Sequence, residues 1–377
     1  MSREMNTGKK GFLVGLISTA LLAGLSGHAV AQTSTTATVT SLTTFTSTGS
    51  SFTGTFTGAG TGTFPTATNY TLNYSGETIA ITSFTTGTGA GAQVYNPLAY
   101  TGTITTTLKR FSSTAGTNQN NNIIYQRVTA QSGTTYTLAG PYTPLQNDLF
   151  NSNNLNAGTD NLFTNTGNGA GNNNNIERVD VVFDLGLTVT DALAFLLLER
   201  GNTGAHDGFQ IAAILSVDAF GAPTSYGSLV SFAADTYGTT DLIASTNWLV
   251  ARNNASEPDF GAEHPSAAVV QPIGGTTISV SGLTSNRGLG IASGTTIYGY
   301  SLFGVDVTGT TSSQLLDIST SFFPKDTSET DGGIDLITYT GVAVQAVPEP
   351  GVLGLLGLAG LAGLAAWRKR RGSPTRD

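Results

Sequence analysis

The residues whose types and spacing could bind an ion lie in one acidic stretch, KDTSETDGGID, at residues 325–335. Calcium binds several oxygen ligands on a flexible loop, and Gly332 and Gly333 permit the tight turns that such a loop needs. The ligand spacing differs from the alternating positions of an EF-hand loop, so a solvated acidic loop is the alternative interpretation. The candidate ligands are Asp326, Glu329, Asp331 and Asp335.

Recognisable catalytic patterns are absent from the sequence. It contains no G-x-S-x-G, H-E-x-x-H, Walker A or G-x-G-x-x-G motif and no cysteine. His206 lies close in sequence to Glu199 and Asp207, but a histidine in a turn explains this pattern without catalysis. Paired carboxylates could support glycoside hydrolysis, yet no spacing selects two of them. The sequence therefore predicts a protein that is not an enzyme and needs no cofactor, with calcium as the one candidate.

Charge is distributed unevenly along the chain. The formal net charge is -8, but residues 32–347 hold eight basic and 21 acidic side chains, a net of about -13. Three basic residues precede residue 32 and five follow residue 367. A nucleic-acid partner is therefore excluded, because neutralising phosphates requires a basic surface.

The first 31 residues have the three parts of a secretory signal peptide. A basic segment precedes the apolar residues 12–25, which are too few to span a ~30 Å bilayer core comfortably. An A-x-A sequence follows, so we expect a signal helix that signal peptidase removes after export; an uncleaved anchor is the alternative. The residues that define the expected cleavage are Ala29, Ala31 and Gln32.

The C-terminal region predicts a transmembrane helix. Residues 351–367 carry no charge and would form roughly 25 Å of helix. Basic residues follow, which favour the cytoplasmic side and stop translocation, and residues 372–377 form a polar tail. The body would then lie outside the inner membrane, as the signal peptide independently requires. The basic stop consists of Arg368, Lys369, Arg370 and Arg371.

Residues 347–371 resemble the PEP-CTERM sorting signal. The resemblance rests on three elements in order: a Pro-Glu-Pro motif, the Gly/Leu/Ala span and the basic stop. It implies that an exosortase, a membrane-embedded cysteine-type transpeptidase, recognises the motif, cuts nearby, and releases or re-attaches the body at the cell surface or in the extracellular matrix. A permanent single-pass anchor with an accidental motif is the alternative. The motif residues are Val347, Pro348, Glu349 and Pro350.

The body, residues 32–346, predicts a mainly β fold, an antiparallel β-sandwich or jelly roll. Thr-rich and alternating segments separated by Gly, Asn and Pro indicate short strands without intervening helices. Asn-rich stretches suggest loops, and a break near 110–176 would divide the body into two halves. One short helix is expected at Ser312–Thr320.

Two strand patterns are specific enough to assign faces. Alternation in VDVVFDL predicts that Val179, Val181, Phe183 and Leu185 face the core while Asp180 and Asp184 face solvent. The apolar run Ala194–Leu198 indicates a strand buried on both faces.

The sequence as a whole indicates an exported surface or extracellular-matrix protein. Its expected partners are signal peptidase, the export machinery, the exosortase and, through the C-terminal helix, the inner membrane. The alternative is a carbohydrate-binding module or a carbohydrate-active enzyme of the matrix, with Tyr142, Tyr226 and Trp248 as aromatic residues that could stack on an extracellular polysaccharide.

Overall fold

The computed structural model describes segments that belong to one compact unit, Thr36–Asp377. The expected signal helix and transmembrane helix lie outside the described residues. The described residues are 39–48, 52–56, 70–74, 77–87, 92–110, 123–132, 135–138, 155–160, 162–163, 176–201, 206–234, 242, 246–253, 263–265, 269–282, 288–324, 334–337 and 343–346.

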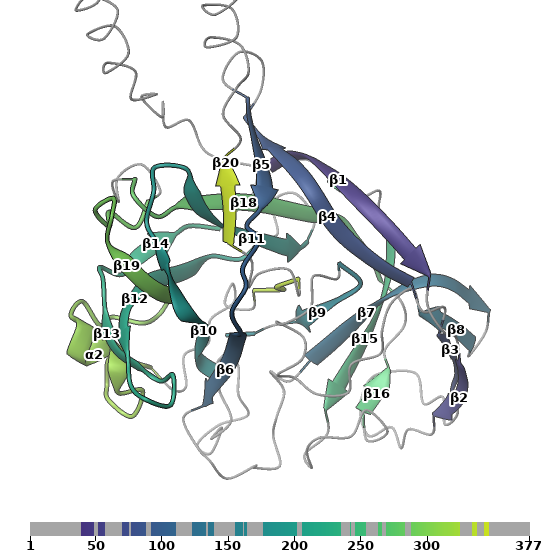
Figure 1. Cartoon of the computed structure of the whole chain (residues 1–377). Helices are drawn as coiled ribbons and strands as arrows, with labels where there is room; N and C mark the ends of the chain where they lie inside the picture. The colour runs from purple at the N-terminus through teal and green to yellow at the C-terminus, as the bar shows by residue number, and fades with distance from the viewer. Residues whose placement is uncertain are drawn as a thin grey trace, which may run out of the picture. The chain divides into compact units, whose positions relative to one another are not determined.

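Sheet I has six strands in the order β1-β4-β5-β20-β11-β18, and each neighbouring pair is antiparallel (Figure 1). Its first strands, β1 and β4, are rich in Thr, a β-branched residue that favours strands. The strands are β1 (Val39–Thr48), β4 (Glu77–Thr86), β5 (Gln93–Pro97), β20 (Ala343–Ala346), β11 (Leu193–Arg200) and β18 (Ile273–Ser279).

Sheet II is also antiparallel, in the order β13-β12-β19-β10-β6, with β14 paired to β12. The close approach of β19 to β10 requires glycine at position 299, because a Cβ there would collide with the Val181 carbonyl oxygen and φ is +125°. The strands are β13 (Pro223–Tyr226), β12 (Phe209–Val217), β19 (Thr296–Phe303), β10 (Ile176–Thr188), β6 (Ile104–Arg110) and β14 (Val230–Phe232).

Sheet III has eight strands, in the order β16-β15-β7-β8-β3-β2, with β17 paired to β15 and β9 paired to β7. The β3–β8 pair is parallel and the other named pairs are antiparallel. The strands are β16 (Glu263–Pro265), β15 (Thr246–Asn253), β7 (Ile123–Ser132), β8 (Thr135–Leu138), β3 (Tyr70–Tyr74), β2 (Phe52–Phe56), β17 (Val269–Gln271) and β9 (Ala157–Asp160).

The largest core cluster joins sheets I and II. Phe195 of β11 lies between Phe183 of β10 and Tyr300 of β19, with ring centroids 6.4 Å and 4.3 Å away. Leu196 and Leu198, on the other side of β11, pack in a second cluster with residues of β4 and β5. Every residue of β11 is buried, so the prediction that Ala194–Leu198 is covered on both faces is confirmed.

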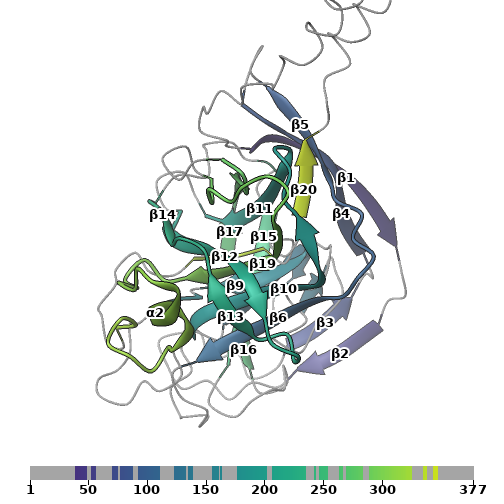
Figure 2. The same ribbon diagram turned by 60° about the vertical axis from the view of Figure 1, so that its left-hand side comes forward.

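The mainly β prediction is confirmed, and pairing is almost entirely antiparallel. Strand pairs join segments on either side of residues 110–176, since β6 pairs with β10 and β5 with β20. β7 lies within that range and pairs with β15. Figure 2 shows strands from early and late parts of the sequence interleaved in the same sheets.

The face assignment of β10 is correct in part. Val179, Val181 and Phe183 are fully buried and Asp184 is exposed, as predicted. Leu185 is instead 67% exposed, because the pairing of β10 with β19 shifts register between Val182 and Leu187 and changes the direction of the intervening side chains.

The prediction that Asp180 faces solvent is wrong, since this residue is only 1% exposed. A third cluster, which includes Val182, Ala212 and Leu315, covers that face of β10. Leu315 belongs to helix α2 (Ser312–Leu316), which is shorter than the predicted Ser312–Thr320 and ends at Asp317 in an extended conformation. Within the described part of the chain, no helix has the length and apolar character needed to cross a bilayer.

Candidate functional site

The segment that carries the resemblance is joined to an internal strand of sheet I. β20 pairs on one side with β5, where Ala346 lies opposite Tyr95, and on the other side with β11, where Gln345 lies opposite Leu193. Its last residue, Ala346, is separated from Pro348 by one residue in the sequence. The predicted sorting motif is therefore tethered directly to the interior of a sheet.

The sequence explains why the strand ends where it does. Proline has no N–H group, so it cannot donate to the hydrogen-bond ladder of an internal strand. The residues Pro348 and Pro350 thus prevent β20 from extending through the motif. The motif residues, the basic stop and the signal cleavage residues Ala29, Ala31 and Gln32 themselves lie outside the described residues.

Asp335 is the one member of the predicted calcium loop that the structure describes. Its carboxylate accepts from the guanidinium of Arg200, with Nη2 and Oδ2 2.8 Å apart, and both side chains are largely buried. The other three candidates, Asp326, Glu329 and Asp331, lie outside the described residues. One carboxylate oxygen of Asp335 is already engaged by Arg200, and the calcium site stays a prediction.

Glu199, Asp207 and Asp335 are brought together at the end of β11. Oε1 of Glu199 accepts from the backbone N–H of Asp207 at 2.9 Å and from that of Asp335 at 3.4 Å, while Oε2 has no hydrogen-bond partner. Burial raises the pKa of Glu199 well above its usual value, and the charges of Asp335 and Asp207 add to the rise, against the backbone hydrogen bonds.

Glu199 joins two parts of the chain that are far apart in sequence, through the backbone N–H groups of Asp207 and Asp335. Glu199 is fully buried and His206 is 4% exposed, so neither presents a catalytic group at the described surface. The described residues contain no group of three or more His, Cys, Asp or Glu side chains arranged to hold a metal. Glu199, at the end of β11, therefore holds the backbone of Asp207, which lies just before β12.

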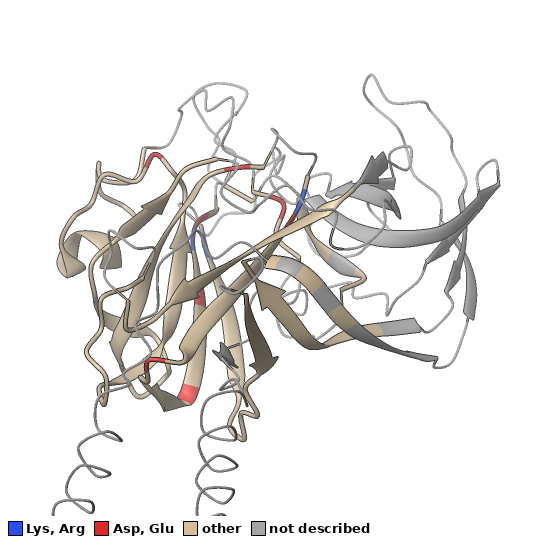
Figure 3. Cartoon of the chain, turned by 90° about the horizontal axis from the view of Figure 1, so that it is seen from above, with Lys and Arg blue, Asp and Glu red and all other residues tan. Residues whose placement is uncertain are grey.

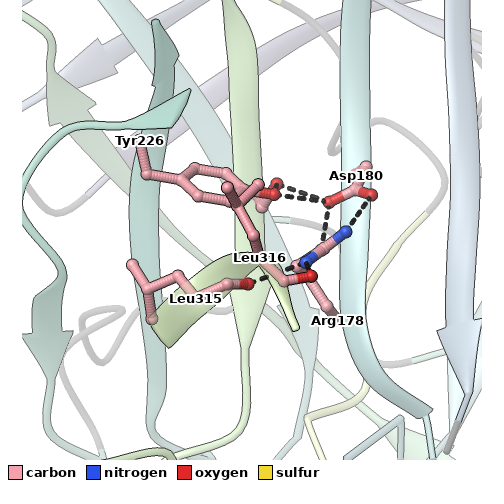
Figure 4. A network of polar contacts seen from close by, with 6 residues as sticks. Arg178, Asp180, Tyr226, Leu315 and Leu316 are labelled. Atoms are coloured by element: carbon pink, nitrogen blue, oxygen red, sulfur yellow. Dashed lines mark hydrogen bonds and ion pairs between the residues drawn. The ribbon is translucent and has the colours of Figure 1, made fainter. Parts of the chain in front are cut away.

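A second buried polar network lies on sheet II, where the sequence predicted solvent (Figure 4). Arg178 and Asp180 form a bidentate pair, with Nε–Oδ1 2.7 Å and Nη2–Oδ2 3.1 Å apart. Oδ1 of Asp180 also accepts from the hydroxyl groups of Ser301, at 2.6 Å, and Tyr226, at 3.2 Å. Figure 3 shows that charged residues are sparse on the described ribbon.

The same arginine connects the sheet to helix α2. Its Nη1 donates to the backbone carbonyl oxygens of Leu315 and Leu316, at 2.7 Å and 3.0 Å, and its guanidinium carbon lies 5.6 Å from the ring centroid of Tyr226. These carbonyl groups at the end of the helix have no intrahelical partner. Arg178 thus satisfies them and fixes the segment that covers β10.

The network corrects the assignment of Tyr226 as a sugar-stacking residue. Its side chain is 4% exposed, and burial beside Asp180 raises its pKa above the usual range. Trp248 lies within β15, although its side chain is not among those described, and Tyr142 lies outside the described residues. The two-residue spacing of Arg178 and Asp180 puts them on the same face of a strand, which is the one sequence signal for this ion pair. The spacing does not show whether that face is buried or exposed.

The described residues thus define a mainly β protein in which an internal strand continues directly into the C-terminal segment. A family of PEP-CTERM protein-sorting motifs matches residues 346–371. The chain therefore carries a PEP-CTERM protein-sorting motif in its C-terminal region, and this motif supports an exported protein targeted to an exosortase. Comparisons with curated proteins and with solved structures find no match.

Proposed function

We propose that the protein is a non-enzymatic component of the cell surface or extracellular matrix. Its β body would be exported with the help of the N-terminal signal peptide, held in the inner membrane by residues 351–367, and then cut near Pro348-Glu349-Pro350. The exosortase would release the body or re-attach it outside the cell. The sorting motif that begins at the last residue of β20 carries this proposal.

Each part of the C-terminal segment has a physical task in this scheme. The apolar span would hold the motif at the depth of a membrane-embedded enzyme, and Arg368–Arg371 would oppose translocation because charges are costly to move through a bilayer. The rigid prolines would present the carboxylate of Glu349 on a helix-free segment.

The body supports a structural role. The core between sheets I and II favours a sandwich, in which the two inner faces supply the packed side chains. The buried polar groups described above are engaged in holding strands and connections together, as with Arg178 and Arg200. A scaffold with these properties presents a stable surface after the sorting segment has been removed.

The test is the intact mass of the protein from membrane and medium fractions of a host that has an exosortase. Wild type should lose residues 351–377, whereas Glu349→Ala should remain full-length in the membrane because the recognised carboxylate is missing. Asp377→Ala is a matched control, since it removes a carboxylate beyond the basic stop and should be processed normally. A full-length wild-type protein as the sole product would contradict the proposal.

A further inference from the structure

The start of β1 and the end of β20 lie at the same edge of sheet I. The four strands β1, β4, β5 and β20 alternate in direction, so the N-terminal end of β1 and the C-terminal end of β20 point the same way (Figures 1 and 2). Val39 lies opposite Thr86, Thr86 opposite Gln93, and Ala346 opposite Tyr95. We name this end of the four strands the exit edge.

The strand register limits the distance between Val39 at the start of β1 and Ala346 at the end of β20. Three strand spacings and a stagger of two residues place Val39 within about 16 Å of Ala346. The chain thus leaves toward the predicted signal peptide and toward the predicted span from neighbouring points on one edge.

The tether from this edge to the predicted span is short. From Ala346 to Gly351 there are five residue steps, which reach at most about 18 Å when fully extended. The headgroup layer on one side of a bilayer is about 5–8 Å thick. The exit edge can therefore stand no more than about 13 Å beyond the headgroups while residues 351–367 are in the membrane.

The tether cannot be lengthened by releasing β20 without breaking sheet I. β20 is paired at Val344, Gln345 and Ala346 with β5, and at Ala343, Val344 and Gln345 with β11. Both ladders would have to open, since the strand is internal to the sheet.

Charge also favours this edge for contact with lipid. Residues 32–347 carry a net charge of about -13, which anionic lipids would repel. The exit-edge segments 39–44, 83–87, 92–96 and 343–346 contain no charged residue. Val94, beside Tyr95, is an exposed apolar side chain at this edge, with 44% of its surface accessible.

We propose that the exit edge of sheet I lies against the lipid surface while the chain is anchored. This inference rests on the membrane span of the proposed function. It implies that the exosortase recognises a motif that directly follows a folded sheet at the lipid headgroups, and not a motif on a long flexible linker.

The absence of cysteine from the chain permits single-cysteine labelling. Full-length Val94→Cys and Leu185→Cys proteins, each carrying a fluorophore, are reconstituted in vesicles of phosphatidylethanolamine and phosphatidylglycerol with nitroxide-headgroup lipid. Leu185 is the matched control, because it is an exposed apolar strand residue away from the exit edge. Its N–H donates at 2.7 Å to the hydroxyl of Tyr100, which lies six residues after Val94 in the connection from β5 to β6. Quenching should be several-fold stronger at position 94.

A variant with a longer segment after Ala346 tests whether the short tether causes the proposed orientation. Insertion of about twenty Gly/Ser residues after Ala346, with a mean span of about 25 Å, should abolish the difference between the two positions. Equal quenching at positions 94 and 185 in protein that floats with the vesicles would overturn the proposed orientation alone. Protein that fails to float with the vesicles would overturn the membrane span, and with it both the orientation and the anchoring step of the proposed function.

Discussion

Replacing Arg178 by methionine should destabilise the fold strongly. The substitution keeps an unbranched side chain but removes the guanidinium, which leaves Asp180 buried at 1% exposure without its cation. Removing one partner of a buried ion pair typically costs about 3–5 kcal/mol. The Leu315 and Leu316 carbonyl groups lose their donor as well, so we expect a decrease in the free energy of unfolding of about 3–5 kcal/mol.

The measurement is urea-induced unfolding of the purified protein, followed by circular dichroism. Lys109→Met is the matched control, because Lys109 lies opposite Arg178 in the pairing of β6 with β10 and is only partly buried. It should change the free energy of unfolding by less than about 1 kcal/mol. The two variants differ in burial and in ion pairing, not in the charge removed.

The double variant Arg178→Met/Asp180→Asn tests the reasoning directly. Neutralising Asp180 removes the uncompensated charge but retains an acceptor for Ser301 and Tyr226. The double variant should therefore be about 1–3 kcal/mol more stable than Arg178→Met alone. The reasoning is refuted if Arg178→Met costs no more than Lys109→Met, or if adding Asp180→Asn destabilises the protein further.

Three other predictions concern pH, calcium and the N-terminus. Because the pKa of Glu199 is raised in the folded state, its contribution to stability is full below about pH 4 and is lost as the pH rises through the folded pKa. Glu199→Gln, which is neutral at every pH, should flatten this part of the stability–pH curve; an unchanged slope would exclude Glu199 as its source. If the acidic loop that contains Asp335 binds calcium, millimolar calcium should raise the melting temperature relative to chelator, and coincident melting curves would rule the site out. Sequencing of the exported protein should begin at Gln32, and an N-terminus at Met1 would show that the signal peptide is retained.

The sorting segment could be identified from the sequence because it is a linear signal. The order of a Pro-Glu-Pro motif, an uncharged span and a basic stop is set by adjacent residues, and the family match covers the same region. The mainly β class could also be predicted, since side-chain alternation is a local property of a strand. The complete burial of Ala194–Leu198 could also be predicted, because an unbroken apolar run is a local feature of the sequence.

Pairing and burial over long sequence distances depended on the tertiary structure. The alternation around Asp180 indicated a solvent-facing carboxylate, because no local pattern shows that α2 and Tyr226 cover that face of β10. Leu185 is exposed because of a register shift against β19, which is likewise a property of two strands and not of one. The placement of β20 between β5 and β11 joins residues about 250 and 150 positions apart. A local sequence pattern specifies which side chains alternate, but only the hydrogen-bond partners and the elements packed on each face decide where a strand lies, and here they decide that the sorting motif emerges from the interior of a sheet.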